Sequence, residues 1–543
     1  MSEHIFKSQF PPVPVVKEPL HEILFSAIRK FADEGRTAFI LAENGEQYSY
    51  VQLRDAIYSI SNFLEQHNFG HGDIACAVLK NCWQFVPIFI SCIGQEGCLS
   101  PASALFTNIE LKEQFKDSHS KLVFCSHESL GVVIEAAKDL PKLKTIIVTD
   151  GPETNLPTNV VHLNSILRNK VNGVRFCSNI DVGKTLVSLP YSSGTTGKPK
   201  GVMLTHKSFG TLLRIASQHF MTEILLKMDK NWNFKREYVL HLLPFYHIYG
   251  FGFLMFSVLN GARSVIMPKF EPELFCAMIE KYQIKFAALV PPILVWLSRT
   301  PLIKKYNLSS IKFLMSGAAP LGKEVVDAVH KALPNVLQVS QAYGSTEESM
   351  CSHLPVFGME NYAAAGRLIS NYEQKIIDLE TGLPLPIGQT GEVCIRSPTL
   401  MLGYFNRPEA TRECMDSEGF WKTGDIGYQD AQGWTYIVDR LKELIKVKGL
   451  QVAPAELEDI LLSHPSVVDC CVIGIPDSKA GEVPKAFVVK TDPSLTSQIV
   501  QKFVADKVAP YKQLAGGVEF VKEMPKSPSG KILRRLLRDK AKL

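Results

Sequence analysis

Apolar positions in the first half of the chain recur with two different periods. Residues 20–31 and 51–64 place apolar side chains at helical spacing, whereas 74–79, 122–125 and 145–148 are short apolar runs bounded by polar or turn residues. Helical stretches that alternate with strand-like runs are typical of parallel sheets covered by helices. The pattern therefore predicts an α/β fold, with helix-covered sheets in a large N-terminal domain.

The pattern changes toward the C-terminus. Turns rich in Gly and Pro at 381–391, 416–419 and 430–433 separate short strand-like runs, which predicts a β-rich subdomain. After Asp439, helical and strand-like segments alternate again at 454–462, 467–475, 486–489 and 497–508. We expect an N-terminal domain over residues 1–439 and a small α+β domain over residues 440–543.

Length and composition limit the classes of function. A chain of 543 residues exceeds the size at which one core stops growing, and a net charge of +5 supplies no basic stripe for nucleic acid. The 12 cysteines form no Cys-x-x-Cys pair, so we expect buried thiols rather than a zinc site or a disulfide framework. The start shows no signal pattern, and apolar runs such as 248–259 are shorter than the roughly 20 residues of a bilayer span. We expect a soluble chain without a transmembrane segment.

The segment Tyr191–Gly201, which follows the strand-like run 185–189, carries the sharpest chemical signal. Its backbone N–H groups can converge on an anion, the hydroxyls add donors, and Lys198 adds positive charge. It is not a Walker A loop, because Pro199 stands where that motif needs Ser or Thr. We predict a phosphate cradle rather than a flexible surface loop, formed by Ser192, Ser193, Gly194, Thr195, Thr196, Gly197 and Lys198.

This segment resembles the signature loop of the adenylate-forming superfamily, which includes acyl-CoA synthetases, 4-coumarate:CoA ligases, beetle luciferases and the adenylation domains of peptide synthetases. Further segments match in the family's order, at Tyr343–Glu347, Thr423–Asp425, Asp439–Lys442 and Pro528–Lys531. The overall resemblance is nearest to insect luciferase-like fatty acyl-CoA synthetases. It implies an ATP-dependent acid:CoA ligase that converts a carboxylic acid to its acyl-adenylate and transfers the acyl group to coenzyme A.

The resemblance also implies roles for individual residues at the nucleotide. Thr346 and Glu347 match the family's metal-organising pair, with Glu347 placing Mg²⁺ on the phosphates of ATP. Asp425 matches the carboxylate that accepts the ribose hydroxyls, and Arg440 adds a nucleotide contact at the domain hinge. The remaining nucleotide-binding residues implied by the resemblance are Gly317, Ala318, Tyr343 and Gly344.

Lysines of the small domain match two further family positions. Lys531 would bridge the carboxylate and the α-phosphate as negative charge builds up, although the segment also reads as a solvated basic tail. Lys446 would serve the CoA transfer, with Lys448 and Gly449 near the CoA channel. The alternating lysines could equally be the wet face of a strand.

The segment Pro244–Gly250 resembles the family segment that lines the acyl pocket, with His247 meeting the carboxylate. The acyl pocket is expected to include Tyr249, Phe251, Phe253 and Met350. These residues are consistent with a medium- or long-chain fatty acid, which we expect, but equally with an aromatic acid or with ordinary core. A 4-coumarate-type ligase, a beetle-type luciferase and a non-catalytic lipid- or nucleotide-binding relative stay open, although Tyr246 and Met350 depart from the luciferase pattern.

The last three residues, Ala541-Lys542-Leu543, are a variant of the Ser-Lys-Leu peroxisomal address. We expect recognition by the peroxisomal import receptor and a peroxisomal location.

Overall fold

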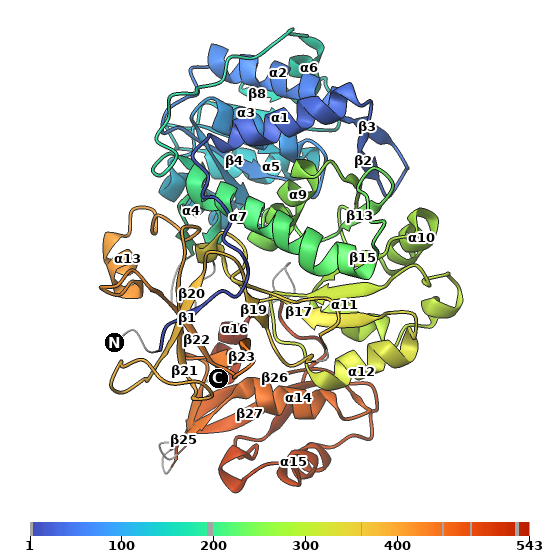
Figure 1. Ribbon diagram of the computed structural model, residues 1–543, viewed down its shortest axis with the longest axis vertical. Helices are drawn as coiled ribbons and strands as arrows, with labels where there is room; N and C mark the ends of the chain where they lie inside the picture. Colours follow the sequence, from blue (N-terminus) through green and yellow to red (C-terminus); the bar gives the residue numbers. More distant parts are fainter. Residues whose placement is uncertain are drawn as a thin grey trace.

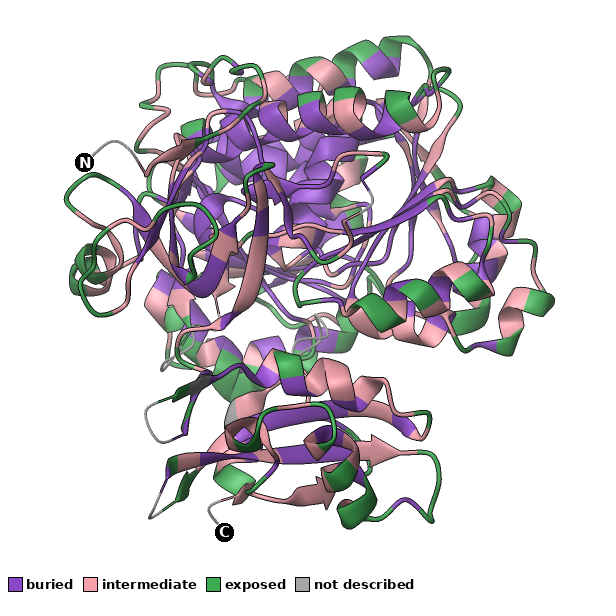
Figure 2. Ribbon diagram, turned by 60° about the horizontal axis from the view of Figure 1, so that its bottom comes forward, coloured by how far each residue is buried: buried purple, intermediate pink, exposed green. Residues whose placement is uncertain are grey.

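The structure is a computed structural model that describes residues 4–192, 199–359, 361–447, 450–477, 480–526 and 532–541. Its N-terminal part combines several sheets with helices, and the C-terminal part packs beneath it in the view of Figure 1. Buried residues concentrate in the interior of the N-terminal part and in the sheet of the C-terminal part (Figure 2). Among the described residues, no helix is both long and apolar enough to span a membrane.

The first sheet is mostly parallel and matches the expected α/β pattern. Its strands β4, β5, β6, β7 and β8 pair in parallel, and β12 closes one edge antiparallel to β9. Every residue of β4 is buried, as expected for a strand covered on both faces. In spatial order the strands are β12 (Leu204–Thr205), β9 (Leu186–Ser188), β5 (Cys98–Ala102), β4 (Ile74–Val78), β6 (Leu122–Cys125), β7 (Thr145–Val148) and β8 (Val160–His162).

Helices of the same region begin at good capping residues. The side chain of Ser49 accepts from the backbone N–H of Gln52 while the Gln52 side chain accepts from the Ser49 N–H, and Thr107 and Glu110 form the same capping box. These caps fix the starts of the second and fourth helices. The helices are α1 (Leu20–Asp33), α2 (Tyr50–Gln66), α3 (Phe85–Gly94), α4 (Asn108–Ser118), α5 (His127–Ala137) and α6 (Leu163–Arg168).

Two smaller sheets follow, one mixed and one parallel. One sheet has the order β13 (Tyr238–His241), β14 (Arg263–Ile266), β2 (Thr37–Leu41) and β3 (Gln47–Ser49); the other is β15 (Phe286–Leu289), β16 (Phe313–Ser316) and β17 (Gln338–Gln341). Their helices are α7 (His206–His219), the π-helix η1 (Phe220–Leu225), α8 (Leu226–Met228), α9 (Ile248–Leu259), α10 (Pro272–Tyr282), α11 (Pro291–Leu297) and α12 (Lys323–Ala332), with short 3₁₀ turns η2 (Pro301–Lys304) and η3 (Thr346–Glu348).

An antiparallel sheet forms the β-rich subdomain that the turns predict. Its order is β1 (Phe6–Lys7), β20 (Glu373–Ile377), β21 (Gly391–Arg396), β22 (Trp421–Gln429), β23 (Trp434–Arg440), β19 (Gly366–Leu368) and β18 (His353–Leu354). Beside it lie helix α13 (Pro408–Cys414) and the short pair β10 (Tyr191–Ser192) and β11 (Lys200–Gly201). The β-rich character of this region is therefore confirmed.

The C-terminal part has a sheet and a core of its own. Its strands are β25 (Leu450–Val452), β24 (Ile445–Val447), β27 (Gly481–Lys490), β26 (Val467–Asp477) and β28 (Val518–Phe520). Its helices are α14 (Pro454–Leu462), α15 (Ser497–Ala505), η4 (Pro510–Lys512) and α16 (Arg534–Ala541). Residues from Ile445 to Leu514 form a core cluster separate from the large cluster of the N-terminal part. The predicted boundary after Asp439 falls between the last two residues of β23, ahead of this sheet in the chain.

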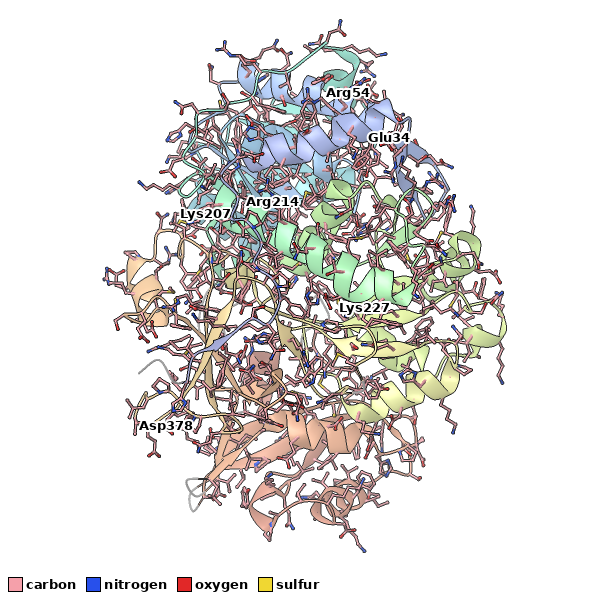
Figure 3. All side chains as sticks on the ribbon, viewed as in Figure 1. Glu34, Arg54, Lys207, Arg214, Lys227 and Asp378 are labelled. Carbon is pink, nitrogen blue, oxygen red and sulfur yellow. The ribbon has the colours of Figure 1, made fainter. Side chains whose placement is uncertain are left out.

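Charged side chains lie over the whole periphery. In Figure 3, Arg54 and Glu34 lie near the top of the view and Asp378 lies at the lower left. Many surface charges pair locally, as Arg54 does with Asp55 and Lys227 with Glu223. Such exposed pairs each stabilise the fold by at most about 1 kcal/mol.

Candidate active site

A cleft, here called the main cleft because it contains the predicted nucleotide residues, lies between the N-terminal sheets and the C-terminal part. It encloses about 1110 Å³. The N-terminal side contributes α11 and the loops after β16 and β17, and the C-terminal side contributes α14 and part of β26 (Figure 1). The residues lining it that the sequence assigns to the nucleotide are Ala318, Tyr343, Gly344, Asp425 and Arg440.

Asp425 is the best-supported charge in this cleft. It lies on β22 directly opposite Arg440 on β23, so the strand register brings the two together. The Nε of Arg440 lies 3.1 Å from Oδ1, and the Tyr343 hydroxyl donates to Oδ2 at 2.7 Å. Burial and the negative charge of Asp425 raise the pKa of Tyr343 well above its usual value, so the phenol stays a donor. The carboxylate is thus held in one orientation at the edge of the cleft.

A tight turn carries the next functional residues. Tyr343 and His353 exchange backbone hydrogen bonds of 3.0 and 3.1 Å across this turn. A Cβ at Gly344 would lie 2.2 Å from the Cα of Cys351, so a residue larger than glycine does not fit. The chain then continues through Ser345 into η3, which carries Thr346 and Glu347.

Glu347 joins this turn to the edge of the phosphate loop. Its Oε1 accepts from the Ser192 hydroxyl at 3.2 Å and from the Tyr404 hydroxyl at 2.9 Å. Ser192 is the one loop residue of the predicted cradle within the described part of the chain. Residues 193–198 lie outside the described residues, so their role in binding phosphate stays a prediction.

The residues around Glu347 fit the magnesium ion that the family resemblance implies. Thr346 and Glu347 offer hydroxyl and carboxylate oxygens, the hard donors that Mg²⁺ prefers. The described residues contain no cluster of three or more His, Cys, Asp or Glu side chains able to hold a metal by themselves. Mg²⁺ commonly binds through one or two carboxylates together with substrate phosphates, so one carboxylate beside a nucleotide site suffices.

The predicted acyl side lies at the start of α9. His247 is the N-cap residue of this helix, and its Nδ1 accepts from the backbone N–H of Tyr249 at 3.3 Å. A neutral imidazole that accepts at Nδ1 carries its proton on Nε2. The Tyr249 ring lies against Gly317, where a Cβ would come within 2.8 Å of it. The Tyr249 hydroxyl is buried with no hydrogen-bond partner among the described residues.

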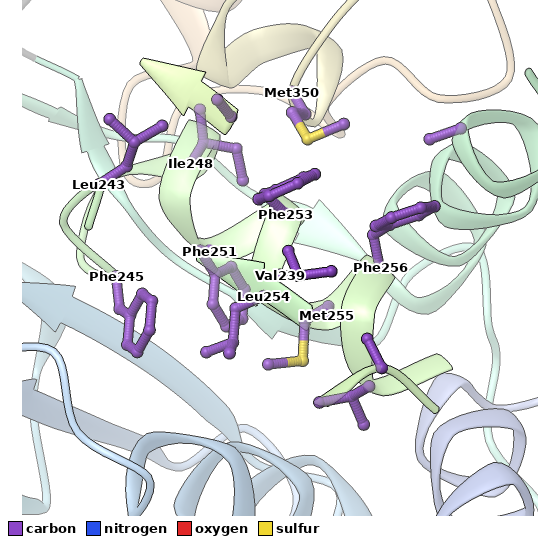
Figure 4. Packing of buried hydrophobic residues seen from close by; sticks show 14 of the residues in the cluster. Val239, Leu243, Phe245, Ile248, Phe251, Phe253, Leu254, Met255, Phe256 and Met350 are labelled. Atoms are coloured by element: carbon purple, nitrogen blue, oxygen red, sulfur yellow. The ribbon is translucent and has the colours of Figure 1, made fainter. Parts of the chain in front are cut away.

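Met350 and the two phenylalanines of the predicted pocket occupy different positions. Met350 packs on Gly252 of α9, where a Cβ would lie 2.4 Å from its Sδ. Figure 4 shows Phe253 on the side of α9 toward Met350 and Phe251 on the opposite side, toward Phe245.

Both phenylalanines are part of an aromatic core. Phe251 is 1% exposed and stacks on Phe209 of α7 at 5.3 Å between ring centroids. Phe253 is 3% exposed and packs against Phe256 and Phe286. Neither lines the main cleft within the described part of the chain. Their contact with substrate stays a prediction, and their visible role is packing.

On the small domain, residues 445–447 form a strand, and the role of Lys446 in CoA transfer stays a prediction. Lys446 is exposed between buried Ile445 and Val447 on β24. Lys446 is not among the described residues that line the cleft, whereas Lys526 and Ile532 are. Lys448, Gly449 and Lys531 lie outside the described residues, and Lys526 and Ile532 flank the segment that contains Lys531.

Tyr404 is the functional candidate that the sequence analysis missed. It contacts Glu347 although 57 positions separate the two residues. The residues before it, Met401-Leu402-Gly403, carry no charged or hydrogen-bonding side chain that would draw attention to this segment. Only the folded chain brings it to the site.

Comparison with known proteins places these observations in a family context. A model described as "AMP-binding enzyme" matches residues 28–405, and a model described as "AMP-binding enzyme C-terminal domain" matches residues 456–531. Similar chains include a probable 4-coumarate–CoA ligase 1 of Dictyostelium discoideum, 37% identical over 98% of this chain and 97% of that protein. A 4-coumarate:CoA ligase 1 of Petunia hybrida is 38% identical over 98% of this chain and 96% of its own length.

Solved structures agree on the fold. An anthranilate CoA ligase in complex with anthranoyl-AMP superposes with a TM-score of 0.86 at 24% identity, covering 98% of each chain. The large N-terminal part with its sheets and the small α+β part are therefore confirmed. The expected nearness to insect luciferase-like synthetases needs correction, because these curated relatives are 4-coumarate:CoA ligases.

Proposed function

The chain belongs to the AMP-binding enzyme family, and we propose that it activates an aromatic acid of the 4-coumarate type. At the level of reaction class it is an AMP-forming acid:CoA ligase, which uses ATP and coenzyme A as substrates. The family expectation of an acyl-adenylate intermediate fits this class. A non-catalytic binding relative is thereby set aside.

The aromatic acid has more support than the fatty acid expected from the sequence. The similar curated chains are named for 4-coumarate, and they match over almost the whole length. The Tyr249 hydroxyl is buried beside Gly317 with no partner among the described residues, and it is not part of the described lining of the cleft; a substrate that reaches it and pairs with it would be favoured over one that cannot. A fatty chain would leave this hydroxyl unpaired.

The chemistry assigns a task to each positioned side chain. The substrate carboxylate attacks the α-phosphorus of ATP, and pyrophosphate leaves. Asp425 holds the ribose hydroxyls while Arg440 and Tyr343 keep its carboxylate in place. His247, with its proton on Nε2, can donate to the attacking carboxylate and orient it. When bound, Mg²⁺ neutralises phosphate charge, and Glu347 would hold it.

One observation carries the assignment of an ATP-dependent ligase to this cleft. A buried carboxylate, Asp425, is fixed by Tyr343 and Arg440 in the same cleft that Gly344 and Ala318 line. That arrangement holds an anionic acceptor toward a cleft large enough for a nucleotide.

A panel of acids tests the proposal directly. The purified chain is incubated with ATP, Mg²⁺, CoA and either 4-coumarate, caffeate, laurate or oleate, and both AMP and acyl-CoA are measured. We expect the highest kcat/KM with the aromatic acids. A preference for laurate or oleate would support the fatty-acid expectation instead, and absence of AMP with every acid would contradict the ligase assignment.

The luciferase alternative has its own measurement. Met350 packs directly on Gly252, so the pocket has a bulky side chain where luciferases keep small residues, and Tyr246 replaces a second histidine. We expect little or no light from the chain with ATP, Mg²⁺ and beetle luciferin. Strong emission would support the luciferase alternative.

Location stays a proposal as well. Ala541 ends α16, and Lys542 and Leu543 lie outside the described residues. We propose that this tripeptide directs the chain to peroxisomes. A fluorescent fusion lacking residues 541–543 should stay in the cytosol, and unchanged peroxisomal spots would contradict the address.

A further inference from the structure

The segment Met401–Arg407, here called the 401–407 strap, pairs with residues 201–203, which follow the predicted phosphate loop in the chain. Backbone hydrogen bonds join Leu402 to Met203 at 2.9 Å and Phe405 to Gly201 at 2.8 Å, so the strap pairs with the strand that returns from the loop. The Met401 N–H also donates to the carbonyl of Glu347 at 2.8 Å. The strap therefore contacts both the phosphate loop and the turn that carries Glu347.

The far end of the strap is anchored on the other side of the loop. Arg407 pairs with Asp117 Oδ1 at 2.7 Å, and the Tyr191 hydroxyl donates to Asp117 Oδ2 at 2.8 Å. Asp117 thus links the strap to the first residue of the predicted phosphate cradle segment. The strap therefore contacts Gly201 directly and is linked to Tyr191 through Asp117.

Tyr404 lies at the centre of the strap and is 8% exposed. Its hydroxyl donates to Glu347 Oε1 at 2.9 Å, and the Lys200 ammonium lies 4.5 Å from the centre of its ring. The second described donor to Glu347, the Ser192 hydroxyl, meets the same oxygen at 3.2 Å. Both donors to this carboxylate from the described part of the chain meet Oε1, so they fix its rotation and direct Oε2 away from Ser192 and Tyr404.

We propose that Tyr404 is a positioning residue that aims Glu347 Oε2 at the cation bound to the phosphates of ATP. This inference rests on the proposed function. The same ring places the Lys200 ammonium beside the loop, so one side chain sets both the carboxylate and a neighbouring positive charge. Tyr404 itself touches neither substrate nor metal.

A variant without the hydroxyl separates this role from packing. Tyr404→Phe keeps the ring that packs under Lys200 and removes only the donor to Glu347. Mn²⁺ serves as the probe. Because Mn²⁺ also binds free ATP, the protein-bound ion is measured by the enhancement of water proton relaxation that appears when Mn²⁺–ATP is immobilised on the protein, and a titration without protein is subtracted. The titration contains full-length protein and ATP but neither acid nor CoA, so no product forms.

We expect Tyr404→Phe to weaken Mn²⁺ binding in the presence of ATP by about tenfold or more, because a hydrogen bond to a charged group is lost. In turnover, the Mg²⁺ concentration for half-maximal rate should rise by a similar factor, while the rate at saturating Mg²⁺ falls less. Tyr50→Phe is the matched control: this buried hydroxyl donates to the Ala262 carbonyl at 3.1 Å, away from Glu347. It should leave Mn²⁺ binding unchanged.

A double-mutant cycle tests whether Tyr404 acts through Glu347. If it does, adding Tyr404→Phe to Glu347→Gln should produce no further loss of Mn²⁺ binding. An equal loss in both backgrounds, or wild-type Mn²⁺ affinity in Tyr404→Phe, would overturn the inference. If the unmodified protein fails to bind Mn²⁺ with ATP, the proposed function fails, which distinguishes the two.

Discussion

Single residues show how the same chemical group serves different purposes in this site. Glu347 accepts two hydroxyl donors, whereas the next residue, Glu348, is fully buried. Burial, together with the negative charges of Asp425 and Glu347, raises the pKa of Glu348 well above its usual value and keeps it neutral. Neighbouring carboxyls in one 3₁₀ turn therefore have different surroundings: Glu347 accepts from two hydroxyls, whereas Glu348 is buried away from water.

The Asp425→Asn substitution is expected to weaken ATP binding by roughly 10- to 100-fold. The amide keeps the shape but loses the charge that pairs with Arg440 and accepts strongly from ribose hydroxyls. Calorimetric titration of ATP measures the change. Asp430→Asn, in the turn that joins the same two strands, controls for the lost charge; equal weakening in both variants would contradict a ribose role for Asp425.

At the scale of elements, the 401–407 strap depends on one unusual backbone position. Gly403 has φ +147°, and a Cβ there would lie 2.8 Å from the Thr411 side chain. The Thr411 hydroxyl accepts from the Tyr404 backbone N–H at 2.9 Å, so α13 holds the strap in place. The orientation of the Tyr404 ring follows from this close contact.

We expect Gly403→Ala to destabilise the fold by about 1–3 kcal/mol, because the new Cβ meets both a disfavoured φ and the Thr411 side chain. It should also slow adenylation by displacing Tyr404. Gly388→Ala is the matched control, with φ +82° but nothing within 4 Å of its Cβ. Urea denaturation compares the two variants, and an equal loss in both would show that the contact with Thr411 is unimportant.

The elements that the sequence predicts well are those with a local signal. The helix predicted at 454–462 is observed as Pro454–Leu462, because proline suits a first helical turn and the apolar spacing is regular. The strand predicted at 486–489 is longer, Gly481–Lys490, since pairing with β26 extends it through residues of low strand propensity. Long-range pairing overrides local preference there.

Some residues of the candidate site are also predictable from local sequence, and others are not. Asp425 and Glu347 stand in recognisable motifs, so their types and spacing identify them from sequence. Tyr404 is recognisable only by its contact with Glu347, and the packing of Phe251 into the core depends on Phe85 and Phe209, which are distant in sequence. Residue chemistry predicts which groups can react, whereas packing decides which ones meet.

At the scale of the whole molecule, the cleft has one side on each part of the chain. The described residues that flank Lys531 line it, whereas Lys446 lies on β24 outside its lining. The family resemblance implies that the segment with Lys531 serves adenylation and that another face of the small domain serves transfer to CoA. The two lysines should therefore serve different half-reactions.

Lys531→Ala is expected to lower the rate of adenylation by on the order of 10²–10³, because one charge aimed at the transition state is removed. Transfer from preformed acyl-adenylate to CoA should continue. Pyrophosphate exchange and single-turnover thioester formation measure the two steps. Equal losses in both steps, with an unchanged circular dichroism spectrum, would contradict the assignment.

Lys446→Ala should show the converse pattern. Its side chain is exposed, so the fold should tolerate the change, and pyrophosphate exchange should stay near normal while CoA transfer slows. Lys502→Ala, on α15 of the same part, controls for the loss of a positive charge. Lost exchange with intact transfer would reverse the roles of the two faces.

Acid should destabilise the whole fold through its buried histidines. Burial lowers the pKa of His21 and His219 to about 4, and of His206, His241 and His353 to about 3. The unfolded chain takes up these protons as pH falls through 6.5, whereas the folded chain takes them up only near pH 3–4. The free energy of unfolding therefore keeps its full value with respect to these histidines above pH 6.5 and decreases as pH falls from 6.5 toward 3–4.

Each such histidine adds up to about 1.4 kcal/mol per pH unit to the slope of unfolding free energy. Urea denaturation at about pH 7.5, 6.5, 5.5 and 4.5 measures that slope. His241→Gln should reduce the slope by about 1.4 kcal/mol per pH unit, because one titrating group is removed. A free energy that stays flat below pH 6 would contradict the neutral buried state of these rings.

The short strand β1 has a consequence for the order of events during synthesis. Phe6 pairs with Gln374 on β20, and the Ser8 hydroxyl donates to the Leu368 carbonyl, 360 positions further along the chain. At roughly 5–20 residues per second, the ribosome delivers that partner on the order of 20–70 s after residue 8. During this interval the N-terminal strand has no edge to join. Chaperone capture of nascent chains should therefore fall once β20 has emerged from the exit tunnel, which ribosome-bound chains of increasing length can reveal.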